Sequence, residues 1–148
     1  MKKKHQLFKE VLDIIEKEST CSRIKTAALN VKDNRIISTG WNGVPSGIEH
    51  CENIFKVKNE TYYDEHHEFS LNREIHCEQN AIGIAAKNEI SIGGADLYIS
   101  ISPCRDCAKL IIASGIKNVY YKELYDREPN VINFLEECGI LVECLGKK

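Results

Sequence analysis

The chain has 148 residues, of which 43% are hydrophobic and 28% charged, and its formal net charge is −2 at pH 7. This size and composition are typical of one globular domain with a buried core, so we expect a single domain over residues 1–148. The charge gives no global basic field and disfavours a nucleic-acid partner, and no segment reaches the roughly 20 apolar residues of a membrane span. We therefore expect a cytoplasmic protein with no membrane partner.

The first half of the chain begins with a predicted helix over residues 4–18, where apolar side chains recur at i, i+3, i+4 and i+7. Strands are predicted over residues 26–31 and 36–40, and the polar turn at 32–35 between them indicates a β-hairpin. Residues 42–70 are polar and contain glycine and proline, which predicts a long irregular stretch. Such a stretch in a compact domain is usually functional or held in place by another group.

Helices and strands alternate in the second half of the chain. The helices are predicted over residues 76–87, 104–114 and 130–138, and the strands over residues 95–101, 119–123 and 140–144. A helix between two strands allows the crossover that a parallel pair needs, so the last two strands are predicted to be parallel. This order predicts an α/β fold with a mixed sheet covered by helices.

Seven cysteines, an odd number, favour free thiols or metal ligation over a disulfide framework. Cys104 and Cys107 lie three residues apart in the first turn of a predicted helix, so both sulfurs point to one side. The helix N-terminus favours their thiolate forms. Two thiolates and the neutral imidazole of His76 suit zinc and leave its fourth position open, which is typical of a catalytic site.

Glu78, two residues after His76, is the predicted general acid/base. Zinc lowers the pKa of a bound water towards about 7. Glu78 would take the water proton, protonate ring N3 of a pyrimidine and later protonate the leaving amine. H-x-E alone or C-x-x-C alone is weak evidence. Their combination, with Pro103 before the cysteine pair, is the pattern of zinc nucleobase deaminases and favours catalysis over a purely structural site.

These motifs resemble the deoxycytidylate deaminase family, within the cytidine-deaminase fold. The resemblance covers residues 19–126, and the segment from Gly40 to Gly47, with its Asn-Gly-x-Pro-x-Gly pattern, points to the deoxycytidylate branch. It implies a three-layer α-β-α sandwich with a five-stranded mixed sheet and parallel final strands. The zinc ligands and catalytic residue that it implies are His76, Cys104, Cys107 and Glu78.

The resemblance also implies two substrate contacts. Asn42 matches the asparagine that contacts the nucleotide, and Tyr125 matches the tyrosine near its phosphate or sugar. The alternatives are a turn asparagine and a core tyrosine. The number of phosphates accepted depends on basic residues of the pocket, for which Arg23 and Lys25 are the candidates.

Some members of this branch carry a second, structural zinc. Cys21, Cys51 and His66 resemble three of its ligands, with His67, His50 or a water in the fourth position. Such a metal would hold the long polar stretch in place, because metal binding can replace hydrophobic burial. The alternative is that Cys21 is a buried thiol and that the histidines are polar surface residues.

The chain departs from the family pattern at Cys77, where the family usually has alanine, and at Trp41, where it usually has tyrosine. Some members are activated by dCTP and inhibited by dTTP, and Trp41 and Lys87 lie in regions tied to that control. Family members usually form homo-oligomers, so a hexamer or a dimer is expected here.

Three functions remain open from the sequence. The first is deamination of dCMP to dUMP and ammonia, which supplies dUMP for thymidylate synthesis, with dCTP as an additional or alternative substrate. The second is another zinc deaminase, acting on cytidine, guanine, a riboflavin precursor or adenosine in transfer RNA. The third is an inactive, zinc-stabilised binding module. Glu78 favours an enzyme, because an inactive module has no need of an acid/base beside an open zinc position.

Overall fold

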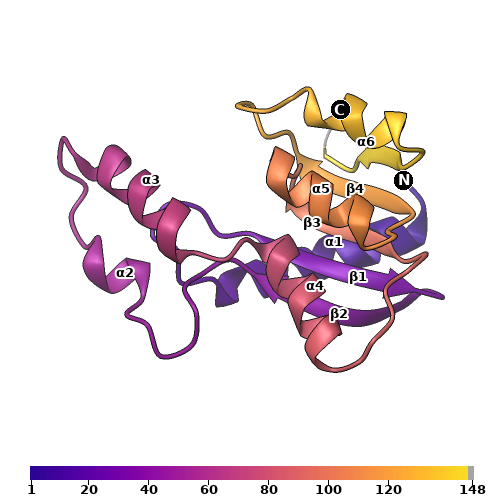
Figure 1. The fold of residues 1–148 in the computed structure, drawn as a ribbon, viewed down its shortest axis with the longest axis horizontal. Helices are drawn as coiled ribbons and strands as arrows, with labels where there is room; N and C mark the ends of the chain where they lie inside the picture. The colour runs from indigo at the N-terminus through magenta and orange to yellow at the C-terminus, as the bar shows by residue number, and fades with distance from the viewer. Residues whose placement is uncertain (147–148) are drawn as a thin grey trace.

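A five-stranded sheet with the strand order β2-β1-β3-β4-β5 forms the centre of the protein (Figure 1). The computed structural model describes residues 1–146. The strands are β1 (Ala27–Lys32), β2 (Arg35–Trp41), β3 (Asp96–Ile101), β4 (Asn118–Glu123) and β5 (Leu141–Cys144). β1 is antiparallel to both β2 and β3, whereas β3, β4 and β5 are parallel. The predicted mixed sheet and its parallel final strands are therefore confirmed.

The hairpin of β1 and β2 turns at Asp33 and Asn34, which have φ angles of 52° and 60°. Positive φ at both central residues is the geometry of a type I′ turn, whose twist matches that of the strands it joins. Aspartate and asparagine tolerate this left-handed region better than most residues. The resulting register pairs Ala28 with Gly40, and Gly40 faces the helix that carries part of the site.

Helices cover both faces of the sheet, which confirms the predicted three-layer sandwich (Figure 1). On one face α1 (Lys3–Ile15) packs Phe8 and Leu12 against strand residues such as Leu29 and Tyr98. A 3₁₀ turn, Glu16–Glu18, follows α1. The helices of the other face are α4 (Cys77–Lys87), α5 (Arg105–Ala113) and α6 (Val131–Glu137). Their buried apolar side chains form the larger core with the opposite set of strand residues, because successive strand side chains alternate between faces.

The predicted irregular stretch over residues 42–70 is wrong in part, because it contains the helices α2 (Cys51–Ile54) and α3 (Tyr62–Arg73). These two helices form an arm, residues 50–73, that projects from the sheet (Figure 1). The apolar periodicity of α3 is weak because most of its side chains are polar. Phe55 holds the two helices together by edge contacts with the rings of Tyr62, His66 and Phe69.

Loops from four strands meet at one edge of the sheet. The carboxyl ends of β2, β3 and β4 and the amino end of β1 all lie there, as the register of the pairs requires. In open α/β sheets the carboxyl ends of parallel strands are the usual place for a ligand site. Within residues 1–146, no helix combines the length and apolar character that crossing a membrane requires.

Candidate metal and catalytic site

Three predicted ligands come together at the amino ends of α4 and α5. His76 is the N-cap residue of α4, Cys104 is the N-cap residue of α5, and Cys107 lies in the first turn of α5. Nδ1 of His76 lies 3.3 Å from Sγ of Cys107 and 3.6 Å from Sγ of Cys104. One ligand atom from each residue lies within 4.8 Å of the others, so this His76 cluster could hold one metal ion.

The surroundings of the His76 cluster favour negatively charged sulfur. The amino ends of two helices point at it, and each carries the positive end of a helix dipole. A hydrogen bond with the Cys107 thiol, opposed by burial and aided by His76, lowers the pKa of Cys104 to about 4. The pKa of Cys107 is raised, because its thiol holds the proton that the pair shares and because it is buried. Two cysteines and one histidine are a zinc donor set with one open position.

Glu78 lies in the first turn of α4 and is only 6% exposed. Burial raises the pKa of its carboxyl, and this is the direction needed for a group that must hold and release a proton near neutral pH. The Cys77 thiol, at the position where the family usually has alanine, lies 3.4 Å from Oε2 of Glu78 and donates to it. The buried Glu78 carboxyl, beside a metal-binding cluster, is therefore a candidate general acid/base.

His76, Cys104 and Glu78 line a cavity of about 550 Å³ at the edge of the sheet. This volume is within the usual range for a small-molecule site. Both predicted substrate contacts, Asn42 and Tyr125, also line it. Its other polar lining residues include Arg23, Thr26, His67, Ser102, Arg105, Arg127 and Glu128.

Asn42 is buried, and every polar atom of its side chain already has a partner. Its Oδ1 accepts from Ser19 Oγ at 2.6 Å and from the Thr26 amide at 2.9 Å, while its Nδ2 donates to the Ile24 carbonyl at 2.9 Å. Asn42 therefore fixes Ile24 and Thr26, which line one side of the cavity. Tyr125 is half-buried, and its backbone amide donates to Ser102 Oγ at 2.7 Å, which fixes the opposite loop after β4.

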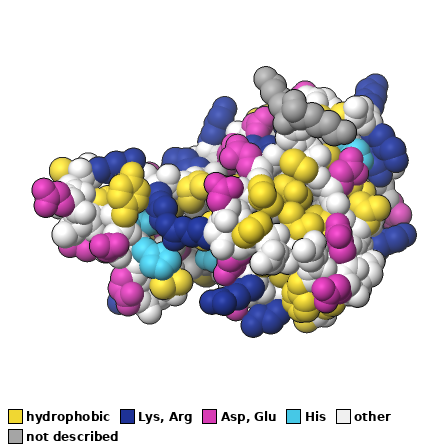
Figure 2. Space-filling model, turned by 90° about the horizontal axis from the view of Figure 1, so that it is seen from above, with side chains coloured by type: hydrophobic (Ala, Val, Ile, Leu, Met, Phe, Trp, Pro, Cys, Tyr) yellow, Lys and Arg dark blue, Asp and Glu magenta, His cyan; other side chains and the backbone are white. Residues whose placement is uncertain are grey.

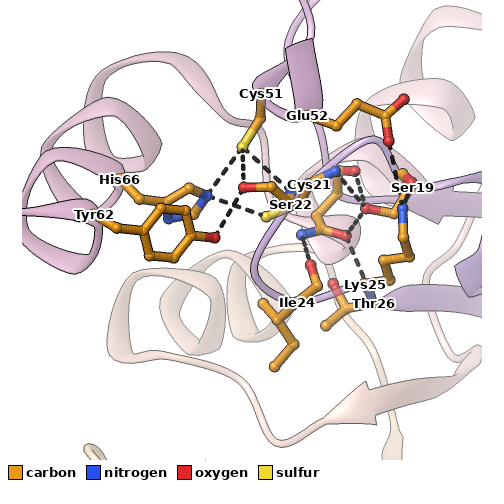
Figure 3. Close-up of polar contacts among 11 residues, drawn as sticks. Ser19, Cys21, Ser22, Ile24, Lys25, Thr26, Cys51, Glu52, Tyr62 and His66 are labelled. Atoms are coloured by element: carbon orange, nitrogen blue, oxygen red, sulfur yellow. Dashed lines mark hydrogen bonds and ion pairs between the residues drawn. The ribbon is translucent and has the colours of Figure 1, made fainter. Parts of the chain in front are cut away.

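A second cluster joins the arm to the sheet. His66 Nε2 lies 3.0 Å from Cys51 Sγ and 3.5 Å from Cys21 Sγ (Figure 3). The structure adds Glu74, so that the Cys21 cluster consists of two cysteines, one histidine and one carboxylate, all buried and within 4.8 Å of one another. His67 and His50, the expected alternatives for the fourth position, are not part of it.

An unpartnered carboxylate oxygen indicates that the Cys21 cluster fits a metal. Among the described residues, the buried atom Glu74 Oε1 has no hydrogen-bond partner. Burying a carboxylate oxygen without a partner is costly unless a cation compensates it. Burial also raises the pKa of Cys21 to about 12, against backbone hydrogen bonds from Ile24 and Arg23 that lower it, so a bound metal would be needed to keep this thiol ionised at neutral pH. The donor set suits a closed, tetrahedral, structural zinc site.

Glu74 was missed in the sequence, although a signal was present. His66, Ser70 and Glu74 follow at i, i+4 and i+8, which places them on one face if a helix runs through them. α3 does so, and Glu74 is its C-cap residue, with Ser70 Oγ donating to its Oε2 at 2.9 Å. Because residues 42–70 were predicted to be irregular, this spacing did not indicate a shared helix face.

Comparisons with known proteins agree with this geometry. The family model for the zinc-binding region of cytidine and deoxycytidylate deaminases matches residues 1–123. The deoxycytidylate deaminase of Enterobacteria phage T2 is 35% identical, over 90% of this chain and 87% of its own. That of Enterobacteria phage T4 is also 35% identical, over 94% of this chain and 88% of its own. The dCMP deaminase of cyanophage S-TIM5, solved with dCMP and dUMP, superposes with a TM-score of 0.79 at 33% identity, over 98% of this chain and 99% of that one.

Proposed function

Since the chain belongs to the cytidine and deoxycytidylate deaminase family, we propose that it hydrolyses dCMP to dUMP and ammonia. The observation that carries this proposal is the buried Glu78 beside the three donors of the His76 cluster, inside a cavity of nucleotide size. The reaction adds one water across the N3–C4 bond of the cytosine ring and releases the amino group of C4 as ammonia. An inactive binding module would have no use for this combination.

The three donors of the cluster, His76, Cys104 and Cys107, hold the catalytic zinc in this proposal. A zinc ion bound there would supply hydroxide at neutral pH. Glu78 moves the protons: its carboxylate takes one from the attacking water and donates it to ring N3, then takes the proton of the new C4 hydroxyl and donates it to the leaving amine. The raised pKa of Glu78 supports both roles, because each needs a carboxyl that is neutral for part of the cycle.

The nucleotide occupies the cavity between the two walls that Asn42 and Tyr125 fix. The side-chain contacts of Asn42 support an indirect contribution, in which it holds Ile24 and Thr26 in place beside the substrate. Tyr125 lies on the loop after β4, on the same side of the cavity as Ser102 and Arg127. Substrate contact by both residues remains a prediction.

The Cys21 cluster holds a second, structural zinc in this proposal. Its four donors come from the segment before β1, from α2, from α3 and from the end of α3, so one ion would join the arm to the sheet. The orphaned Glu74 oxygen supports this assignment.

Other aspects of the function remain predictions. They are a single domain, a cytoplasmic location, assembly as a homo-hexamer or homo-dimer, control by dCTP and dTTP, and the use of the dUMP product in thymidylate synthesis.

A substrate comparison tests the proposed function. Zinc-loaded protein is incubated separately with dCMP, dCTP, deoxycytidine and cytidine, and ammonia release is followed together with the loss of cytosine absorbance. We expect dCMP to be deaminated with the highest kcat/KM. A higher value for dCTP would keep the chemistry and change the substrate, whereas no turnover of any of the four by protein of verified zinc content would contradict the proposal.

A further inference from the structure

We propose that residues 74–76 couple the two metal clusters, so that loading of the Cys21 cluster positions the ligand His76 and raises the zinc affinity of the His76 cluster. This inference rests on the two metal sites of the proposed function. It makes the second site a determinant of metal binding at the catalytic cluster, and not only of the stability of the arm. The contacts at both ends of residues 74–76 carry it.

The two clusters are joined by a very short stretch of backbone. Glu74 belongs to the Cys21 cluster and His76 to the other cluster, and only Ile75 separates them. Glu74 has φ and ψ angles of −90° and 134°, and His76 has angles of −69° and 154°, so both residues are extended. Side chains two residues apart in an extended segment point to the same side. The two Cα atoms lie at most about 7 Å apart, so residues 74–76 supply neighbouring donors to two metal sites.

Ile75, the middle residue of this link, is held by its own backbone groups. Its amide donates to the Gly43 carbonyl at 2.8 Å, and its carbonyl accepts from the Gly43 amide at 3.2 Å. These two bonds form an isolated antiparallel bridge. A Cβ atom on Gly43 would lie 3.0 Å from Oγ1 of Thr20, the residue before Cys21. The segment that pairs with the link therefore also lies beside the Cys21 cluster.

The catalytic end of the link is fixed to α4. The His76 amide donates to Oε1 of Gln79 at 2.8 Å, which ties this N-cap residue to the first turn of the helix. Glu78 lies in the same turn. A displacement of Glu74 is therefore transmitted to the imidazole of His76 and to the turn that carries Glu78, because only paired backbone lies between them.

The arm end of the link depends on the Cys21 cluster for its order. α2 and α3 have few contacts with the helices and strands of the body. Figure 2 shows the arm projecting from the body, with histidine side chains near the junction. Ser70 Oγ holds one carboxylate oxygen of Glu74, whereas the other oxygen has no hydrogen-bond partner within residues 1–146. A cation in the cluster would hold this second oxygen and so fix Glu74 at the junction.

Ordering the link once serves both clusters. Fixing the backbone of one residue changes an equilibrium constant by roughly 5- to 30-fold at 25 °C. When loading of the Cys21 cluster has already ordered residues 74–76, zinc binding at the His76 cluster no longer carries this entropic cost. We therefore expect a coupling factor of about 10 to 100, which is within the usual range for coupled sites. Coupling is reciprocal, so a loaded His76 cluster raises the affinity of the Cys21 cluster by the same factor.

Zinc titrations of the full chain in chelator-buffered solution test the coupling without any turnover. Cys51→Ser leaves the His76 cluster as the one complete site, and Cys107→Ser leaves the Cys21 cluster, so each variant gives one single-site association constant. We expect the overall two-ion constant of the wild type to exceed the product of these two constants by about 10- to 100-fold. The His76 cluster of Cys51→Ser stays loaded in zinc-replete solution, and only its affinity falls.

Two further variants support this measurement. Cys21→Ser removes another donor of the same cluster and should give the same single-site constant as Cys51→Ser, so the result does not depend on the folding of one variant. Cys144→Ser, at an exposed thiol outside both clusters, should give the wild-type two-ion constant.

Ile75→Gly tests whether residues 74–76 are the route of the coupling. It keeps every donor of both clusters and loosens the link, because glycine has the greatest backbone freedom. The same three constants, measured in an Ile75→Gly background, should give a coupling factor near one. Ile75→Val is the matched control: it keeps a stiff, β-branched side chain and should keep the wild-type factor.

Three results would overturn the proposal. A wild-type constant equal to the product of the single-site constants would show that the clusters are independent. A full coupling factor in the Ile75→Gly background would show that residues 74–76 are not the route. A wild-type chain that binds only one ion would overturn the second site and the coupling together. None of these readouts uses deamination, so a protein with coupled ions that converts none of the four substrates would support the coupling and overturn the proposed deamination.

Discussion

Gly40 of β2 lies directly against the first turn of α4, at the carbonyl oxygen of Cys77. A Cβ atom on Gly40 would overlap this oxygen and the amide nitrogen of Ala81. Both obstacles are backbone atoms, so neither can rotate away. The close approach of strand and helix that glycine permits here sets the position of the turn that carries His76 and Glu78.

We therefore expect Gly40→Ala to damage both stability and activity. Relieving the overlap requires a shift of α4, and overpacking of this kind costs about 1–3 kcal/mol in the free energy of unfolding. Because the shift moves Glu78 relative to the His76 cluster, kcat should fall more than the loss of folded protein explains. Thermal unfolding and dCMP turnover of the same samples measure the two effects.

Gly83→Ala is the matched control for this substitution. Gly83 lies within α4, and a Cβ there has no atom within 4 Å. Alanine is the better helix former by about 1 kcal/mol, so Tm should rise slightly and kcat should not change. Equal effects of the two substitutions would show that the contact between Gly40 and α4 does not position the site.

Removal of one donor from the Cys21 cluster should remove one metal ion and leave the other. We expect Cys51→Ser to lower the zinc content from about two ions per chain to about one, with the His76 cluster still occupied. Loss of the ion that joins the arm to the sheet should lower Tm by about 5–10 °C, which corresponds to roughly 2–3 kcal/mol. Metal analysis of dialysed protein and calorimetry measure both quantities.

Cys144→Ser serves as the control for metal content, since Cys144 is an exposed free thiol outside both clusters. It should retain the wild-type zinc content. An unchanged zinc content in Cys51→Ser would contradict the second metal site.

His5 should make the protein less stable in mild acid. Burial, aided by Lys4 and Lys2 and opposed by Glu143 and Asp96, lowers the pKa of His5 below its ordinary value of 6.5. The unfolded chain therefore binds this proton more readily than the folded chain, and stability falls as the pH drops from about 6.5 towards the folded-state pKa. Above pH 6.5 this contribution to stability is fully present.

His5→Asn should reduce this dependence. Asparagine keeps a polar atom near Nδ1, which lies 2.8 Å from the Tyr98 hydroxyl, but it does not titrate. We expect the fall in Tm between about pH 7.5 and pH 5.5 to be smaller in His5→Asn than in the wild type. His67→Asn, at an exposed histidine, is the control and should match the wild type. An identical pH dependence of wild type and His5→Asn would refute the role of His5.

The sheet and the His76 cluster could be predicted because their signals are local. The turn at Asp33 and Asn34 lies between two apolar runs, and His76 and Cys104 each stand at the start of a helix with their partners two or three residues away. Strand periodicity and helix-start signals need only a few neighbouring residues. The site motifs therefore coincide with the clearest structural signals in the sequence.

The arm could not be predicted in the same way, because its structure depends on contacts between residues that are distant in the sequence. α3 has little apolar periodicity, and its contacts are made through Phe55 and through His66 to Cys21, 45 residues away. The position of Glu74 in the cluster depends on the same helix. Likewise, the sequence does not reveal that Lys25 contacts both Ser19 and Glu52.

The central claim, that Glu78 moves the protons of dCMP deamination at the His76 cluster, is tested most directly by Glu78→Gln. This substitution keeps the shape of the side chain and removes its acid/base chemistry. With zinc content and Tm verified, we expect kcat for conversion of dCMP to dUMP to fall by about 10²- to 10⁴-fold. Glu137→Gln, on the exposed face of α6, should retain full activity. A Glu78→Gln protein that binds zinc and still converts dCMP at the wild-type rate would contradict the account.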